Sequence, residues 1–238
     1  IFAFFKDFIK SRSTESILCL LRVVTVVCAI YYILPIGSRS AQTAAYSKVF
    51  IAAAATNALR AHQRVGAIQF SREFLGRILV EDSCHYLLYS LFFLTVSPVT
   101  MALVPVFLYA LLNACSFIVQ LFNAIGNGSN AAIRKIAELT NANTQNMLNV
   151  IACSEILVMP ILVVMIFAGK ASIFHPFVYY RFLTLRYLSR RNASTRMAFY
   201  HLRVFLEKTV SSPSCPQIIR LIVHNLIAFT CRLCPTVN

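Results

Sequence analysis

The chain has 238 residues, 58% of them hydrophobic, and 22 Lys and Arg against 8 Asp and Glu give a formal net charge of +14. The apolar excess excludes an ordinary soluble domain and makes the bilayer the expected solvent. Proteins with a basic excess of this size usually bind phosphate groups, either in nucleic acid or in lipid headgroups. Because the sequence has no zinc-finger spacing, RNP-type strand or basic heptad, we expect the partner to be lipid and not nucleic acid.

The first predicted elements are an interfacial segment and a membrane span. Residues 1–10 place Phe2, Phe5 and Ile9 near one helical face and charged residues toward another, as in a short interfacial helix. We assign 1–16 to an N-terminal interfacial segment. Residues 17–36 are apolar except for Arg22 and a few hydroxyls, and about twenty helical residues cross a bilayer core. Arg22 lies about one turn inside this span, where its side chain can reach the interface.

Two less apolar helices follow. Residues 43–64 are rich in Ala but are interrupted by Lys48, Asn57 and Arg60, so this helix is expected to pack against the bundle or to lie in the interface. Residues 70–82 form another amphipathic helix. Whether 43–64 crosses the bilayer stays open.

The region 86–122 is apolar for longer than one straight helix needs, and Pro98 interrupts it. We expect a short helix at 83–96 that enters from the interface, followed by a second span at 99–122. The alternative is a single span with a long kinked extension.

After a loop at 126–130 and a polar helix at 131–142, a third span is predicted at 147–168. It contains Glu155, which is expected to form a salt bridge because an unpaired carboxylate in hydrocarbon is costly. Residues 17–169 thus form a transmembrane helical bundle. The fold class is an all-α integral membrane protein with about three full transmembrane helices and several interfacial or partly inserted amphipathic helices.

Residues 170–238 form a basic region, which we expect to be cytosolic, with amphipathic helices. It contains ten basic residues and one acid, Glu207, and helices are predicted at 177–189, 196–209 and 217–233. Each basic residue near an anionic leaflet contributes about 1 kcal/mol to membrane binding. The alternative is that these helices pack on the bundle. The residues expected to bind membrane are Arg196, Phe199, Leu202, Arg203, Phe205, Leu206, Lys208, Ile219, Arg220, Ile222, Val223 and Leu226.

The distribution of Lys and Arg predicts the orientation of the chain, since their excess stays cytosolic. The segment 37–85 carries six of them and 123–146 only two. With three spans, the N-terminus and 123–146 are lumenal, whereas 37–85 and the C-terminus are cytosolic. Asn127 would then be a usable glycosylation site and Asn192 would not.

The densest cluster of reactive side chains is Glu81, Asp82, Cys84 and His85 at the start of a hydrophobic helix. Capping and ion pairing explain it better than acid–base chemistry, and we expect no catalytic residue, metal or cofactor. A structural polar network is predicted instead, formed by Arg60, Glu81, Asp82, His85, Glu155, Arg181 and Arg186. The rival hypothesis is an ion-coupled carrier or membrane enzyme that uses Asp82, His85 and Glu155.

Several blocks of sequence resemble the transmembrane protein 33 family, also called the Krüppel homologue 2 or pore-membrane family. They are NALRAHQR at 57–64, EDSCHYLLYS at 81–90, PVTM at 98–101, IAC at 151–153, and YYRFLTLRY at 179–187 with SRRN at 189–192. The resemblance extends from about residue 17 to the CPTV ending. The family's polar N-terminal extension and a Pro-Tyr-Cys after Asn192 are missing.

This resemblance implies a multi-pass, non-enzymatic protein of the endoplasmic reticulum membrane and nuclear envelope. It implies roles in reticulon-dependent tubule architecture, nuclear pore assembly and the unfolded-protein response, with reticulons, channel subunits or other membrane proteins as partners. The family's membrane-curvature-binding helices correspond to 196–209 and 217–233. We therefore expect a membrane organiser that docks other membrane proteins, the alternative being an accessory subunit of a larger membrane complex.

Overall fold

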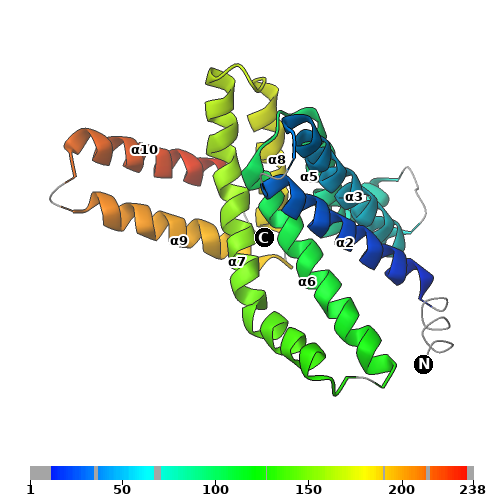
Figure 1. Cartoon of the computed structure of the whole chain (residues 1–238). Helices are drawn as coiled ribbons and strands as arrows, with labels where there is room; N and C mark the ends of the chain where they lie inside the picture. The colour runs from blue at the N-terminus through cyan, green and yellow to red at the C-terminus, as the bar shows by residue number, and fades with distance from the viewer. Residues whose placement is uncertain are drawn as a thin grey trace.

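The computed structural model describes residues 12–34, 37–66, 71–126, 128–189, 191–212 and 215–234. Within these residues the chain is helical and has no strand (Figure 1). The predicted interfacial helix at 1–10 lies outside them. The helices are α2 (Ser13–Ile33), α3 (Arg39–Val65), α4 (Arg72–Val80), α5 (Asp82–Thr95), α6 (Thr100–Ala124), α7 (Ala131–Phe167), α8 (Phe174–Leu188), α9 (Ala193–Val210) and α10 (Gln217–Leu233).

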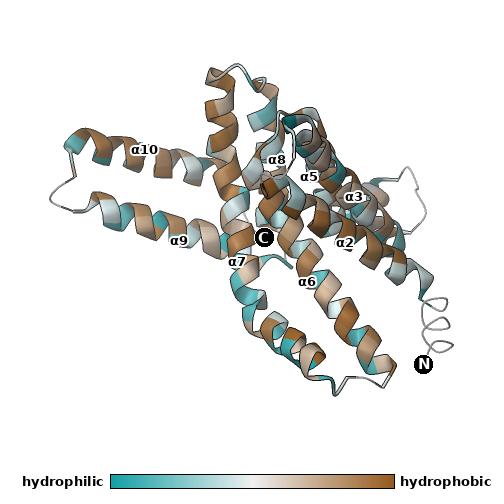
Figure 2. Cartoon of the chain, in the orientation of Figure 1, coloured by the Kyte–Doolittle hydropathy of each residue, from teal (hydrophilic) through white to brown (hydrophobic). Residues whose placement is uncertain are grey.

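Three of the described helices, α2, α6 and α7, are long and apolar enough to cross a membrane. They confirm the predicted all-α membrane fold with three candidate spans. The separate polar helix predicted at 131–142 is wrong, because α7 continues through it without a break. The polar side chains there bond back to their own helix: Asn143 donates to the Leu139 carbonyl at 2.8 Å. In Figure 2 the first half of α7 is mainly hydrophilic and the second half mainly hydrophobic.

Short connections gather at one end of the bundle, which we call the short-loop end. There the Tyr32 hydroxyl at the end of α2 lies 3.1 Å from that of Thr100 at the start of α6. Ser97, before α6, donates to the carbonyl of Lys170, after α7, at 3.1 Å. From this end α3 and α8 run back along the bundle. The end of α3, the start of α5 and the end of α8 therefore lie together, farther along the bundle from the short-loop end; we call this the second level.

The core between these two levels is aromatic. Phe50 of α3, Phe93 of α5 and Tyr179 of α8 are buried, with Phe50 and Phe93 stacked at 5.5 Å and Phe93 and Tyr179 edge-to-face at 5.9 Å. Helix α3 therefore packs against the bundle, which was one of its two expected positions. Helix α8, although it belongs to the basic C-terminal region, is also part of the core.

Helices α9 and α10 form a hairpin that protrudes sideways from α7, away from α2 and α3 (Figure 1). Gln145 of α7 donates to Ser194 at the start of α9 at 3.5 Å, which places the base of the hairpin beside the polar half of α7. Because α8 folds back along α7, the C-terminal hairpin protrudes from the middle of α7, where its polar half meets its apolar half (Figure 1). The sequence analysis assigned the 131–146 segment and the C-terminal region to opposite sides of the membrane.

Candidate functional site

A buried arginine joins four helices at the level where α8 ends. Arg186 is only 1% exposed. Its Nε donates to both carboxylate oxygens of Glu155 on α7, at 3.1 and 3.3 Å. Its Nη1 donates to Asp82 on α5 at 3.2 Å, and its Nη2 to the Tyr109 hydroxyl on α6 at 3.1 Å. One guanidinium thus satisfies two carboxylates, which is the arrangement that makes a buried charge tolerable.

Glu155 is fully enclosed and receives further donors besides Arg186. The Tyr86 hydroxyl donates to its Oε1, and Thr195 of α9 donates to its Oε2 at 3.5 Å. The Tyr179 hydroxyl donates to the backbone carbonyl of the same residue at 2.8 Å. The carboxylate is therefore engaged on both oxygens and fixed in position.

Glu81, just before α5, is the centre of a second ion-pair cluster. Arg64 of α3 lies 2.7 Å from its Oε1, and Arg191 lies 3.0 Å from its Oε2. Burial by itself would raise the pKa of Glu81, but the hydrogen bond and charge of Arg64, together with Arg191, hold this pKa below its ordinary value. This cluster joins α3, α5 and the start of the hairpin.

His85 is buried beside Asp82. Its Nε2 lies 2.8 Å from the Leu79 carbonyl and its Nδ1 lies 3.7 Å from Asp82. Burial lowers the pKa of His85, and the Leu79 carbonyl and the Asp82 charge oppose this only partly. A neutral ring that donates from Nε2 to Leu79 fits this geometry.

The structure brings together five of the seven residues predicted for the polar network: Glu81, Asp82, His85, Glu155 and Arg186. Arg60 lines an adjacent cavity and forms no ion pair with the described residues. Arg181 belongs elsewhere, with its guanidinium 5.7 Å from the Phe177 ring, in an aromatic groove between α5 and α8. Arg181 and Arg186 are five residues apart on α8, so they point to different faces.

The network also contains residues outside the seven predicted for it, namely Arg64, Tyr86, Tyr109, Arg191 and Thr195. Tyr86 could have been predicted from the sequence, because it lies four residues after Asp82 and hence on the same helical face. No sequence pattern pointed to Thr195. Its contact with Glu155 depends on how α9 meets α7, which no local pattern encodes.

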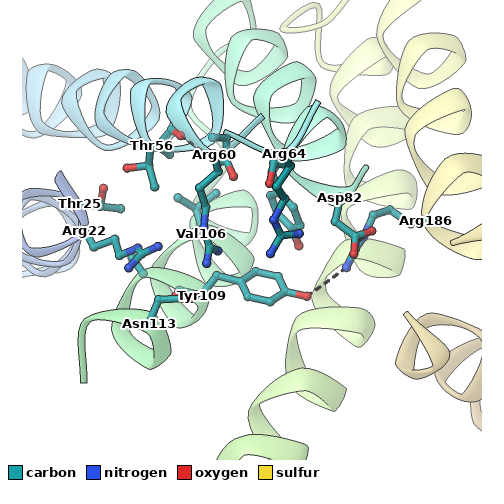
Figure 3. A pocket seen from close by; sticks show the side chains of 15 residues that line it. Arg22, Thr25, Thr56, Arg60, Arg64, Asp82, Val106, Tyr109, Asn113 and Arg186 are labelled. Atoms are coloured by element: carbon teal, nitrogen blue, oxygen red, sulfur yellow. Dashed lines mark hydrogen bonds and ion pairs between the residues drawn. The ribbon is translucent and has the colours of Figure 1, made fainter. Parts of the chain in front are cut away.

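A cavity of about 330 Å³ lies beside the network, between α2, α3, α5 and α6. Figure 3 shows the side chains around it, with Tyr109 hydrogen-bonded to Arg186 at one edge. Four arginines contribute to its wall, but only one carboxylate does. The residues that line it are Arg22, Thr25, Ala53, Thr56, Asn57, Arg60, Arg64, Asp82, Ser83, Tyr86, Val106, Tyr109, Ala110, Asn113 and Arg186.

The hairpin presents only part of the predicted membrane-binding set. Phe205, Lys208, Ile219, Ile222 and Leu226 are exposed, as is Arg203, which pairs with Glu207 at 2.7 Å, whereas Leu206 and Val223 are half-buried.

Four of the predicted membrane-binding residues are used within the chain. Phe199 and Leu202 pack toward Ile156 of α7, because this face of α9 meets the bundle. Arg196 donates to the Ser189 carbonyl at 2.9 Å, and Arg220 donates to the Val210 carbonyl at 3.0 Å. These two guanidinium groups therefore stabilise the connection between α8 and α9 and the connection between α9 and α10.

The described residues contain no group of three or more His, Cys, Asp or Glu side chains placed to hold a metal ion. Cys231 and Cys234, which have the spacing of a metal or redox half-site, are exposed on or just after α10.

Comparison with known protein families matches residues 2–236 to the transmembrane protein 33/nucleoporin POM33 family. The chain belongs to this family. It is 43% identical over 231 residues to transmembrane protein 33 of Homo sapiens, covering 97% of this chain and 94% of that protein. It is 43% identical to the Caenorhabditis elegans homolog (97% and 85%) and 40% identical to Krueppel homolog 2 of Drosophila melanogaster (95% and 80%).

No solved structure matches the chain. The family match includes α8, the network and the hairpin, since all of them fall within residues 2–236. This protein is therefore a family member across its whole described fold, and the family's description as a transmembrane protein agrees with the three candidate spans.

Proposed function

We propose that this family member is a non-enzymatic organiser of the endoplasmic reticulum membrane and nuclear envelope, in which the α9–α10 hairpin binds the cytosolic leaflet. The observation that carries the proposal is the surface of α10. None of its residues is buried, and large apolar side chains such as Ile218, Leu221 and Phe229 stay exposed. Apolar surface of this kind is covered by lipid or by a partner.

The charge of the hairpin indicates that lipid, rather than a protein partner, covers this apolar surface. Beside the apolar side chains, the two helices carry Arg203, Lys208 and Arg232 on their exposed surfaces and only one acid, Glu207. An anionic leaflet attracts such a surface. The hairpin lies crosswise to α7, so its apolar residues can enter a membrane surface that α7 crosses (Figure 1).

The same argument supports a cytosolic orientation for the hairpin end. Arg64, Arg191 and the basic residues of the hairpin gather there, whereas the short-loop end has few, among them Arg39 and Lys170. The excess of Lys and Arg stays on the cytosolic side of a membrane. The segment 131–146 is then cytosolic as well.

The polar network supports a structural role rather than carrier or enzyme chemistry. Asp82 and Glu155 both accept hydrogen bonds from Arg186, so neither carboxylate is free to exchange a proton or ion without breaking a buried pair. Docking of other membrane proteins, such as reticulons or channel subunits, stays a proposal to be tested by native pulldown and mass spectrometry.

Membrane insertion can be measured in the full chain, because its sequence contains no Trp. A Phe229→Trp variant reports on α10, and Leu139→Trp on the polar half of α7 is a matched control, since the two side chains are 59% and 53% exposed. In anionic liposomes, brominated lipids should quench the first tryptophan but not the second. If the tryptophan of the Phe229→Trp variant emitted at the wavelength typical of a water-exposed indole and was not quenched by brominated lipids, membrane binding by α10 would be overturned.

An accessory role in a larger complex is the second candidate, since the same α10 surface could contact protein. In native membranes, a blue-shifted Phe229→Trp emission that brominated lipids do not quench would favour it. For membrane shaping itself, the wild type should tubulate liposomes and Ile222→Asp/Leu226→Asp should not, as seen by electron microscopy.

A further inference from the structure

Two arginines of the cavity form no ion pair with the described acids. Arg22 on α2 is only 7% exposed, and Arg60 lies beside it on α3. Neither side chain forms an ion pair or a hydrogen bond with another described residue. The other two arginines of the wall differ, because Arg64 is paired with Glu81 and Arg186 is paired with Asp82 and Glu155.

The unpaired arginines point into one space. Figure 3 shows the guanidinium groups of Arg22, Arg60 and Arg64 converging on the region next to Tyr109. Burial, followed by the charge of Arg64, lowers the pKa of Arg60 because each disfavours its charged form, and the charge of Glu81 opposes this only partly. Like charges held together away from bulk water are costly unless an anion compensates them.

The neutral polar groups of the wall do not supply that compensation. Four of them donate to carbonyls of their own helices at 2.7–2.9 Å, namely Thr25, Thr56, Asn57 and Asn113. The Tyr109 hydroxyl accepts from Arg186, which leaves its own proton for the cavity. The oxygens of these four side chains can still accept hydrogen bonds, but they carry no charge, so they cannot replace an ion pair. A ligand that compensates Arg22 and Arg60 must therefore be an anion with acceptor oxygens.

We propose that this cavity binds a terminal phosphate group, carried either by a lipid headgroup or by a soluble phosphate compound. A phosphomonoester carries roughly −1.5 to −2 charge at pH 7, which matches two uncompensated arginines. The planar guanidinium fork binds phosphate oxygens in pairs. At about 330 Å³ the cavity is in the size range of small-ligand pockets and is larger than one simple halide needs.

The two sources would reach the site by different routes. Arg60 lies near the end of α3, at the level of the exposed ion pairs of Arg64 and Arg191, where a soluble compound can enter. Arg22 lies near the middle of the candidate span Ser13–Ile33, so a lipid would bind with its phosphate below the level of the other headgroups. The inference is independent of the proposed membrane shaping, because no residue of α9 or α10 lines the cavity. The two proposals can therefore fail separately.

The test uses the full chain in phosphatidylcholine nanodiscs. Inorganic phosphate is added in solution, or phosphatidic acid is added to the disc, with phosphatidylglycerol as an anionic lipid without a terminal phosphate. The thermal unfolding midpoint is measured, and native mass spectrometry detects retained phosphatidic acid. The variant is Arg22→Gln/Arg60→Gln, and the control is Arg72→Gln/Arg77→Gln, which removes the same charge from exposed positions on α4.

At least one of the two phosphate probes should raise the midpoint in the wild type and in the control, and the cavity variant should need about tenfold more of it. A shift with phosphatidic acid alone identifies a lipid ligand, and a shift with inorganic phosphate identifies a soluble one. No shift with either probe, an equal response of wild type and cavity variant, or an equal shift with phosphatidylglycerol would overturn the proposal.

The cavity variant should fold, since it removes uncompensated charge: without phosphate, its midpoint should equal or exceed that of the wild type. If it cannot be purified in folded form, Arg22→Lys replaces it, because lysine keeps the charge but lacks the fork. Binding should then be about fivefold weaker, a difference of about 1 kcal/mol. An unchanged affinity in Arg22→Lys would contradict a phosphate site at this position.

Discussion

Arg186 on α8 and Glu155 on α7 form a buried ion pair in which one nitrogen, Nε, lies 3.1 and 3.3 Å from the two carboxylate oxygens. Removing the Glu155 charge leaves the buried Arg186 with only the partly exposed Asp82 as an acidic partner. Glu155→Gln is therefore expected to lower the free energy of unfolding by roughly 3–5 kcal/mol. Thermal or chemical unfolding of the purified protein in detergent micelles measures this.

The matched control removes both charges. Glu155→Leu/Arg186→Met should be less destabilised than Glu155→Gln, since no buried charge stays unpaired on α7 or α8. Asp82 keeps its hydrogen bond from Ser189 at 2.9 Å and is partly exposed, so it tolerates the loss of Arg186. A double variant that is less stable than the single variant would contradict the ion-pair explanation.

Tyr86→Phe tests the hydroxyl that donates to Glu155. A hydrogen bond to a charged group contributes roughly 1.5–3 kcal/mol, and the variant should lose about that much stability in the same unfolding measurement. Tyr200→Phe is the control, because this side chain is exposed on α9. Equal, small effects of the two substitutions would show that the Tyr86 hydroxyl does not stabilise the fold.

Stability should depend on pH through Glu81. Its pKa in the folded protein is lower than in the unfolded chain, so folding is favoured while the group is ionised. The contribution is fully present above the unfolded pKa of about 4.3 and is lost as the pH falls through the folded pKa. The unfolding midpoint of the wild type should therefore exceed that of Glu81→Gln at pH 7, and the difference should shrink below pH 4. A difference independent of pH would be evidence against the ion pairs with Arg64 and Arg191.

Cysteine labelling tests the arrangement of the two ends. In a background without other cysteines, Cys231 on α10 and Ser129→Cys in the loop before α7 should react with an impermeant maleimide from the same side of sealed microsomes. Lys170→Cys at the short-loop end should react only after the membrane is opened. Labelling of Cys231 and Ser129→Cys from opposite sides would instead support the orientation predicted from sequence.

Hydropathy along the chain was enough to find α2, α6 and α7, because each contains a continuous apolar run of spanning length, and helical periodicity was enough to find α9 and α10. The network was predicted only in part. Glu155 had to have a partner because of its position in a span, but Arg181 and Arg186 were equally good candidates. The rotation of α8, set by Tyr179 and Phe182 in the aromatic core, determines which arginine turns inward.

The sequence by itself thus determined the solvent, the helical class, the spans and the need to compensate buried charge, since these follow from composition and local period. The tertiary structure decided which charges meet, because Arg186 and Asp82 are 104 residues apart and no local pattern relates them. It also decided that α8 returns along α7 and places the basic hairpin beside the middle of that helix. The unpaired Arg22 and Arg60 could be recognised only there, since a missing partner is a property of the packed fold and not of the chain.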